Sequence, residues 1–159
     1  MVTPVKHAYE RIPYLVAYQN DSKVRDVYGG VAELVVLESY LLKPNTDSDI
    51  GAAGSATSDT VLVFMHPIGG GAYLPMINAL ARAGHHVIYC NSRFRGTDTS
   101  LLMEKVVQDL GECIKDARDR LGYSTVVLAG WSGGGSLSVF YQQQAQHPTV
   151  TAAPSGDGP

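Results

Sequence analysis

The sequence has only two cysteines among its 159 residues, and neither belongs to a metal-binding pattern. Cys90 and Cys113 fall in segments typical of a strand and a helix, with no Cys-x-x-Cys or Cys/His spacing around them. This usage argues against a disulfide framework and against a structural zinc site. We expect both cysteines to be reduced core residues, and we expect no metal and no cofactor.

Long apolar runs and clusters of one charge are also missing. No stretch approaches the roughly 18 uninterrupted apolar residues of a membrane span, and residues 1–20 mix charged residues with prolines where a signal peptide needs an apolar segment. No stretch gathers more than two or three Lys or Arg, and the formal net charge is −3. The sequence therefore predicts a cytoplasmic protein that has no membrane span and binds no nucleic acid.

What the sequence does contain is an alternation of short apolar runs with amphipathic segments. The runs 60–65, 86–90 and 125–129 are typical of strands buried in a parallel sheet. Helical periodicity follows them over residues 73–83, 103–121 and 135–146. Residues 31–42 add one or two strands near a sheet edge. The pattern predicts an α/β fold, a mostly parallel sheet with crossover helices on both faces.

The segment from Gly130 to Gly134 fits the motif G-x-S-x-G. With 17 glycines in the chain the string alone is weak evidence, but it directly follows a predicted strand and opens a predicted helix. That setting makes Ser132 a candidate nucleophile, with Gly130 and Gly134 as the small residues that a strained turn needs. The N–H of Gly133 would then face an oxyanion at a helix N-terminus.

The alternative for this turn is a glycine-rich connection that serves packing or binds phosphate. A P-loop needs Gly-Lys-Ser/Thr, and the chain has no such tripeptide. A dinucleotide fingerprint needs G-x-G-x-x-G, and the candidates that begin at Gly69 and Gly133 both lack the third glycine. Nucleotide binding therefore stays a remote option.

A second glycine-rich segment, His66 to Gly71, follows the first buried run. An acyl-transfer enzyme needs a second N–H at this place, aimed at the same oxyanion. Glycines there let the backbone approach a substrate closely. A flexible strand-to-helix loop without special chemistry is the alternative, and the serine motif two strands later favours the functional interpretation.

Residues from about 31 to 148 resemble the N-terminal half of an α/β-hydrolase of the esterase and lipase type. The resemblance rests on residues 66–71, similar to the family's H-G-G-G segment, and on the turn 130–134; residues 95–100 are a weaker match to an R-G-x-G-x-S turn, with Asp98 in place of a glycine. Pro67 replaces a glycine and lacks an N–H. The resemblance thus implies Ile68 or Gly69 as the second oxyanion donor, and His66 as a residue that orients this loop through a hydrogen bond.

In that family the catalytic acid and histidine follow the serine in the chain. After Ser132 this sequence has only Asp157, in a tail rich in small residues, and His147, at the far end of a predicted helix. We therefore expect an incomplete fold, with residues 1–30 as an N-terminal extension, 31–148 as the N-terminal half of the domain and 149–159 as a loop or cleavage-prone tail. A C-terminal fragment or a second chain would supply the acid and the histidine.

These features together predict a carboxylesterase-like serine hydrolase that acts on a small-molecule ester through an acyl-enzyme on Ser132. The fragment alone is expected to be inactive. Tyr73, Phe94, Trp131 and Phe140 could line an acyl pocket or belong to the core. An acyltransferase and a non-catalytic ligand-binding protein on the same scaffold remain alternatives.

Overall fold

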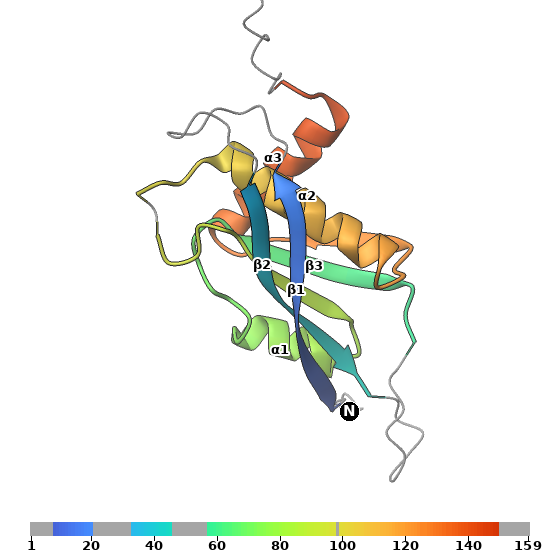
Figure 1. The fold of residues 1–159 in the computed structure, drawn as a ribbon. Coiled ribbons are helices and arrows are strands. Elements are labelled where there is room, and N and C mark those ends of the chain that lie inside the picture. The colour runs from blue at the N-terminus through green and yellow to red at the C-terminus, as the bar shows by residue number, and fades with distance from the viewer. Residues whose placement is uncertain (1–7, 21–32, 46–56, 98, 150–159) are drawn as a thin grey trace, which may run out of the picture.

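The computed structural model of this chain describes residues 8–20, 33–45, 57–97 and 99–149 (Figure 1). Five strands form one sheet in the order β1-β2-β4-β3-β5. The strands are β1 Tyr9–Asn20, β2 Glu33–Pro44, β3 Thr60–His66, β4 Val87–Asn91 and β5 Thr125–Ala129; the helices are α1 Pro75–Arg82, α2 Met103–Asp119 and α3 Gly133–Gln146.

Strand directions place several loops at one edge of the sheet. β2 is antiparallel to both β1 and β4, whereas β3 is parallel to β4 and β5. Only β2 therefore runs against the other described strands, and the predicted mostly parallel sheet is confirmed. Because β3, β4 and β5 end at the same edge, the segments 66–74, 91–97 and 130–133 meet there.

Helices cover both faces of the sheet, as predicted (Figure 1). On one face, α1 buries Ile77 and Ala81 in a cluster with Phe64, Val87 and Tyr89 of the strands. On the other face, α2 and α3 share the larger cluster, whose members include Val61, Val63, Ile88, Val106, Leu110, Cys113 and Leu137. Both cysteines are free and buried, so the expectation of reduced core residues is confirmed.

Strand β1 departs from the expectation that residues 1–30 are an extension, because Tyr9–Asn20 pairs with β2 along its whole length. Arg11, Pro13 and Gln19 interrupt the apolar pattern that would have indicated this strand. Pro13 is tolerated since β1 lies at the edge of the sheet, where a strand needs hydrogen bonds on one side only.

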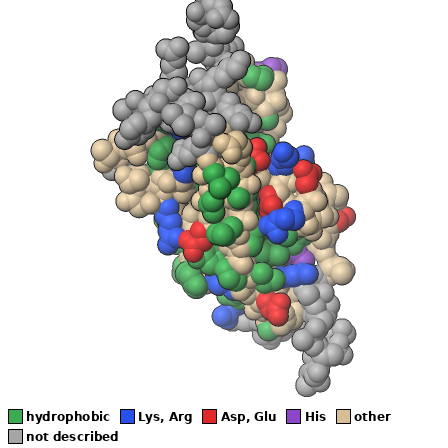
Figure 2. Space-filling model, viewed as in Figure 1, with side chains coloured by type: hydrophobic (Ala, Val, Ile, Leu, Met, Phe, Trp, Pro, Cys, Tyr) green, Lys and Arg blue, Asp and Glu red, His purple; other side chains and the backbone are tan. Residues whose placement is uncertain are grey.

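The outer face of the β1–β2 ribbon carries exposed apolar side chains (Figure 2). Leu15, Leu34 and Val36 are 62%, 64% and 49% exposed. They lie on the same face as Leu42, which is buried in the α1 cluster. In the described part of the chain, helix α1 covers only one end of this face.

The prediction that 125–129 is a strand is confirmed, but among the described residues it is not buried. β5 is an edge strand, paired with β3 on one side only. Its residues are exposed or half-buried, and Val127 is 42% exposed. A run of apolar residues indicates the strand correctly but cannot show whether a neighbour covers its second edge.

A buried ion pair ties β1, α2 and the loop after β4 together. Asp109 on α2 is 0% exposed. Its carboxylate accepts hydrogen bonds from the Arg93 Nη2 at 2.8 Å, the Arg93 backbone N–H at 2.9 Å and the Tyr18 hydroxyl at 2.6 Å. Burial, followed by the Asp109 carboxylate, raises the pKa of Tyr18, so its hydroxyl keeps the proton that it donates. This network fixes the start of the segment 91–97.

Substituting Asp109→Asn should destabilise the protein by about 3 kcal/mol, because it leaves the Arg93 guanidinium largely buried without a counter-charge. Chemical denaturation measures the loss. Asp116→Asn is the matched control on the same helix, since its partner Arg120 is half exposed and such pairs contribute about 1 kcal/mol or less. Equal losses in the two variants would contradict the structural role of the Arg93–Asp109 pair.

Candidate active site

Ser132 occupies a strained turn between β5 and α3. Its backbone has φ 51° and ψ −128°, and it is the only non-glycine residue with positive φ among the described residues. Such a sparsely populated conformation costs a residue with a side chain about 1–3 kcal/mol. The strain places an exposed serine directly before the first residue of a helix.

Two glycines make this turn sterically possible. A Cβ on Gly130 would lie 2.3 Å from the Cα of Gly135, and a Cβ on Gly134 would lie 2.4 Å from the carbonyl oxygen of Met65. Both contacts involve backbone atoms, which cannot rotate away as a side chain would. A Cβ on Gly135, in contrast, would meet nothing within 4 Å. Glycine is thus required at 130 and 134 and merely present at 135.

The first turn of α3 leaves one N–H available beside Ser132. The N–H groups of Gly134 and Gly135 donate to the carbonyl oxygens of Trp131 and Ser132 at 2.8 and 3.0 Å. Among the described residues, none accepts a hydrogen bond from the N–H of Gly133. This N–H lies at the positive end of the helix dipole, where an anion is favoured.

The segment 66–71 is held by hydrogen bonds on both sides of its backbone. The N–H groups of Ile68 and Gly69 both donate to His66 Nδ1, at 3.2 and 2.7 Å. On the other side, the carbonyl oxygen of Ile68 accepts the Gly96 N–H at 2.8 Å, that of Gly69 accepts the Tyr89 hydroxyl at 2.6 Å, and that of Pro67 accepts the Ser92 hydroxyl. The segment is therefore fixed, and both expected oxyanion donors face the imidazole of His66.

The tyrosine in this arrangement stays a donor because burial raises the pKa of Tyr89 to about 12. Tyr89 also explains the third glycine of the segment, since a Cβ on Gly71 would lie 2.6 Å from its ring. Neither Tyr89 nor Ser92 was a candidate from the sequence. Their position within and just after β4, a strand parallel to β3, is the only signal that could have indicated them.

The imidazole of His66 lies between this segment and the serine turn. Its ring centroid is 5.3 Å from that of Trp131, and a Cβ on Gly133 would stand 3.2 Å from its Nε2. Burial lowers the pKa of His66, which favours the neutral ring. A neutral ring that accepts at Nδ1 carries its proton on Nε2. His66 therefore cannot take a proton from Ser132 through Nε2.

Among the described residues, no other histidine and no acidic residue that follows Ser132 in the chain lies beside it. His147 ends the 14-residue helix α3, roughly 20 Å along its axis from the serine. Asp98 and Asp157 lie outside the described residues, and the described residues that follow Ser132 include no Asp or Glu. The structure thus places Ser132, Gly133, His66, Ile68 and Gly69 at one edge of the sheet, and the part of the chain that it describes offers no general base beside them.

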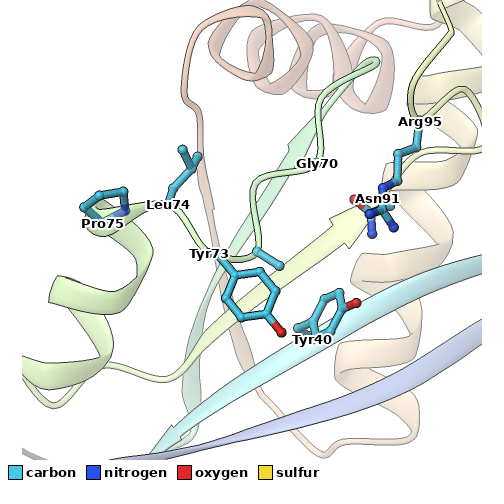
Figure 3. A pocket seen from close by; sticks show the side chains of 8 residues that line it. Tyr40, Gly70, Tyr73, Leu74, Pro75, Asn91 and Arg95 are labelled. Atoms are coloured by element: carbon cyan, nitrogen blue, oxygen red, sulfur yellow. The ribbon is translucent and has the colours of Figure 1, made fainter.

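A cavity of about 310 Å³ opens beside the glycine-rich segment (Figure 3). Its lining consists of Tyr40, Gly70, Ala72, Tyr73, Leu74, Pro75, Asn91 and Arg95. The rings of Tyr40 and Tyr73 meet edge to face at 6.2 Å, and Arg95 pairs with Glu38. Of the aromatic residues considered from the sequence, Tyr73 lines this cavity whereas Phe94 is part of the core.

Two further kinds of site concern the described residues, a metal-binding cluster and a membrane-spanning helix. No group of three or more His, Cys, Asp or Glu among them could hold a metal ion. None of the helices in the described ranges is long and apolar enough to cross a membrane.

The glycine requirement gives a direct test of the turn. Gly134→Ala should destabilise the protein by about 3 kcal/mol or more, because the added methyl would overlap the Met65 carbonyl oxygen. Gly135→Ala should be neutral or stabilising by about 1 kcal/mol, since the methyl enters open space and alanine favours a helix. Thermal denaturation of both variants measures the difference. A Gly134→Ala variant as stable as Gly135→Ala would contradict the packing described above.

Comparison with known proteins agrees with this geometry. No curated protein matches the chain. Among solved structures, a serine hydrolase without a lid from Xanthomonas campestris matches with a TM-score of 0.50 and 20% identity, over 92% of this chain and 60% of that one. The chain thus spans less than two thirds of that protein's length, and the likeness shows the fold alone.

Two further solved structures are similar at lower scores. A proposed lipase from Acinetobacter baumannii has a TM-score of 0.44 and 14% identity, over 85% of this chain and 39% of that one. A proposed carboxylesterase from Lactobacillus plantarum has a TM-score of 0.44 and 14% identity, over 86% and 50%. The family model of the alpha/beta hydrolase fold matches residues 60–151, more than half of the chain. This protein therefore belongs to the alpha/beta hydrolase family.

Proposed function

We propose that this protein is a serine hydrolase that cleaves a carboxylic ester through an acyl-enzyme on Ser132. The observation that carries the proposal is the strained backbone of Ser132, φ 51°, directly before the available N–H of Gly133. Strain of this kind persists only where the surrounding structure enforces it, and it clusters at functional sites. A turn built for packing alone has no need of a strained, exposed serine.

In the proposed reaction, the Ser132 hydroxyl oxygen attacks the ester carbonyl carbon and the carbonyl oxygen becomes an oxyanion. The Gly133 N–H donates to this oxyanion at the positive end of α3. Ile68 and Gly69 are the expected sources of a second N–H. In this structure both of those groups donate to His66 Nδ1, so either must leave the imidazole before it can reach a substrate.

We further propose that a companion C-terminal segment supplies the general base and its carboxylate partner. Three observations support this: His147 is remote, His66 holds its proton on the nitrogen nearer the serine turn, and β5 has an unpaired edge among the described strands. A further parallel strand on that edge would bring its own carboxyl end, and the loop that follows it, beside Ser132.

The cavity in Figure 3 is a candidate pocket for one part of the ester. The cavity lies beyond the end of β4. Strand β4 is separated from β5, which precedes Ser132, by two strand spacings, or about 10 Å. The tyrosine rings of the cavity and the Arg95–Glu38 pair suit a compact aromatic or polar group better than a long alkyl chain.

Covalent labelling tests the nucleophile. A fluorophosphonate should label Ser132 in the protein combined with its proposed companion segment, called the full-length protein below, and the Ser132→Ala variant should lose the label completely. Ser136→Ala is the control, because Ser136 is also an exposed serine near the start of α3. Residues 1–159 alone should show no ester hydrolysis above background. Absence of label in the full-length protein would favour a non-catalytic binding protein, and a fully active 159-residue chain would contradict the need for a companion segment.

The cavity has its own test. Tyr73→Ala should raise KM for small aryl esters severalfold while leaving the fluorophosphonate labelling rate unchanged, because Tyr73 lines the cavity and is 70% exposed. Val139→Ala provides the control, an equally exposed apolar truncation on α3 that does not line this cavity. An unchanged KM in Tyr73→Ala would show that the ester does not use this pocket.

A further inference from the structure

His66 stands where an oxyanion donor would be needed, and it holds the two N–H groups that were expected to fill that role. We propose that His66 is itself a catalytic residue, whose neutral Nε2–H donates a hydrogen bond to the oxyanion formed on Ser132, together with the N–H of Gly133. This inference rests on the proposed function. It assigns His66 a contact with the reacting atoms in addition to its hydrogen bonds within the loop.

The hydrogen bonds of the ring determine which nitrogen carries the proton. Nδ1 lies 3.2 Å from the Ile68 nitrogen and 2.7 Å from the Gly69 nitrogen, and both of these backbone groups can only donate. Nδ1 must therefore be an unprotonated acceptor. The proton of the neutral ring is on Nε2, for which the described residues provide no acceptor. Burial keeps the pKa of His66 low and so favours this neutral state.

The position of Nε2 suits an oxyanion shared with Gly133. A Cβ on Gly133 would lie 3.2 Å from Nε2, and Cα–Cβ bonds of a helix tilt toward its N-terminus, as its first N–H groups do. A Cβ stands about 2.5 Å from the nitrogen of its own residue, so Nε2 lies within about 5.7 Å of the Gly133 nitrogen. Two donors at about 2.9 Å from one oxygen can be at most about 5.8 Å apart, so this upper limit on their separation is compatible with one oxyanion between them.

The rest of the loop disfavours the alternative in which Ile68 or Gly69 donates directly. The carbonyl oxygens of Pro67 and Ile68, which precede these two N–H groups, accept hydrogen bonds from the Ser92 hydroxyl and the Gly96 N–H. Because each peptide unit is planar and trans, those bonds direct the N–H groups to the opposite side, toward His66. Turning either N–H to a substrate would break hydrogen bonds on both sides of the loop.

The proposed step is balanced without proton transfer through His66. A bond forms between Ser132 Oγ and the carbonyl carbon, and the π electrons of the carbonyl move to its oxygen. The serine proton goes to the base of the companion segment and later to the leaving alcohol, while Nε2 donates a hydrogen bond and keeps its proton. Neutral imidazoles serve as electrophiles of this kind in other enzymes.

Two matched substitutions separate a donor from a loop-orienting residue. In His66→Asn, the amide oxygen occupies the place of Nδ1 and can still accept the Ile68 and Gly69 N–H groups, but no donor remains at Nε2. In His66→Gln, the amide nitrogen reaches the place of Nε2. In full-length protein we expect His66→Asn to lower kcat for ester hydrolysis about 100-fold or more, with KM little changed. His66→Gln should recover at least part of this loss.

If His66→Asn had the kcat of wild-type protein, the inference would be overturned. Such a result would mean that position 66 needs only an acceptor for the Ile68 and Gly69 N–H groups, which is the loop-orienting role. The ring itself gives a second measurement that needs no variant. ¹⁵N NMR of wild-type protein should show the proton on Nε2, and the Nε2–H signal should move downfield when a fluorophosphonate reacts with Ser132. A proton on Nδ1, or a signal that does not move, would overturn the inference. A labelled Ser132 with an unresponsive His66 rejects only this inference, whereas an unlabelled Ser132 rejects the proposed function itself.

Discussion

The contact between the first turn of α3 and the end of β3 is the constraint on which the site depends. A Cβ on Gly134 would stand 2.4 Å from the carbonyl oxygen of Met65. A Cβ on Gly130 would stand 2.3 Å from the Cα of Gly135. The chain must therefore pass from β5 into α3 within a few residues. Ser132 takes a strained conformation with positive φ within this passage, and the packing of α3 against the sheet compensates the cost.

A second set of contacts makes the loops around the serine one rigid unit. The buried pair of Asp109 and Arg93 anchors the segment after β4, and the neighbouring Ser92 and Gly96 hold the carbonyl groups of Pro67 and Ile68. Those peptide units in turn direct two N–H groups onto His66 Nδ1. A carboxylate on α2 is thus connected, through a chain of hydrogen bonds, to the orientation of the imidazole beside the serine turn. Preorganised donors of this kind are what stabilises charge in a transition state.

The sequence allowed the parallel strands, the three helices and the serine turn to be predicted, because apolar periodicity and glycine spacing are local signals. Strand β1 could not be predicted, since its partner β2 and its edge position, which tolerate Pro13 and Arg11, are tertiary facts. The apolar run of β5 likewise indicated a buried strand, whereas its burial depends on a neighbour that the described residues do not provide. At the site, the motif indicated which residues gather. It could not show that the N–H groups of Ile68 and Gly69 bind a side chain, because that depends on the rotamer of His66 and on hydrogen bonds from β4.

The central claim is that Ser132 is a nucleophile whose oxyanion is held at the N-terminus of α3. A crystal structure of the protein together with the proposed companion segment, after reaction with a fluorophosphonate, tests this claim most directly. We predict phosphorus bonded to Ser132 Oγ, with a phosphonyl oxygen about 3 Å from the Gly133 nitrogen. An adduct on another residue, or a phosphonyl oxygen that points away from α3 into solvent, would contradict it.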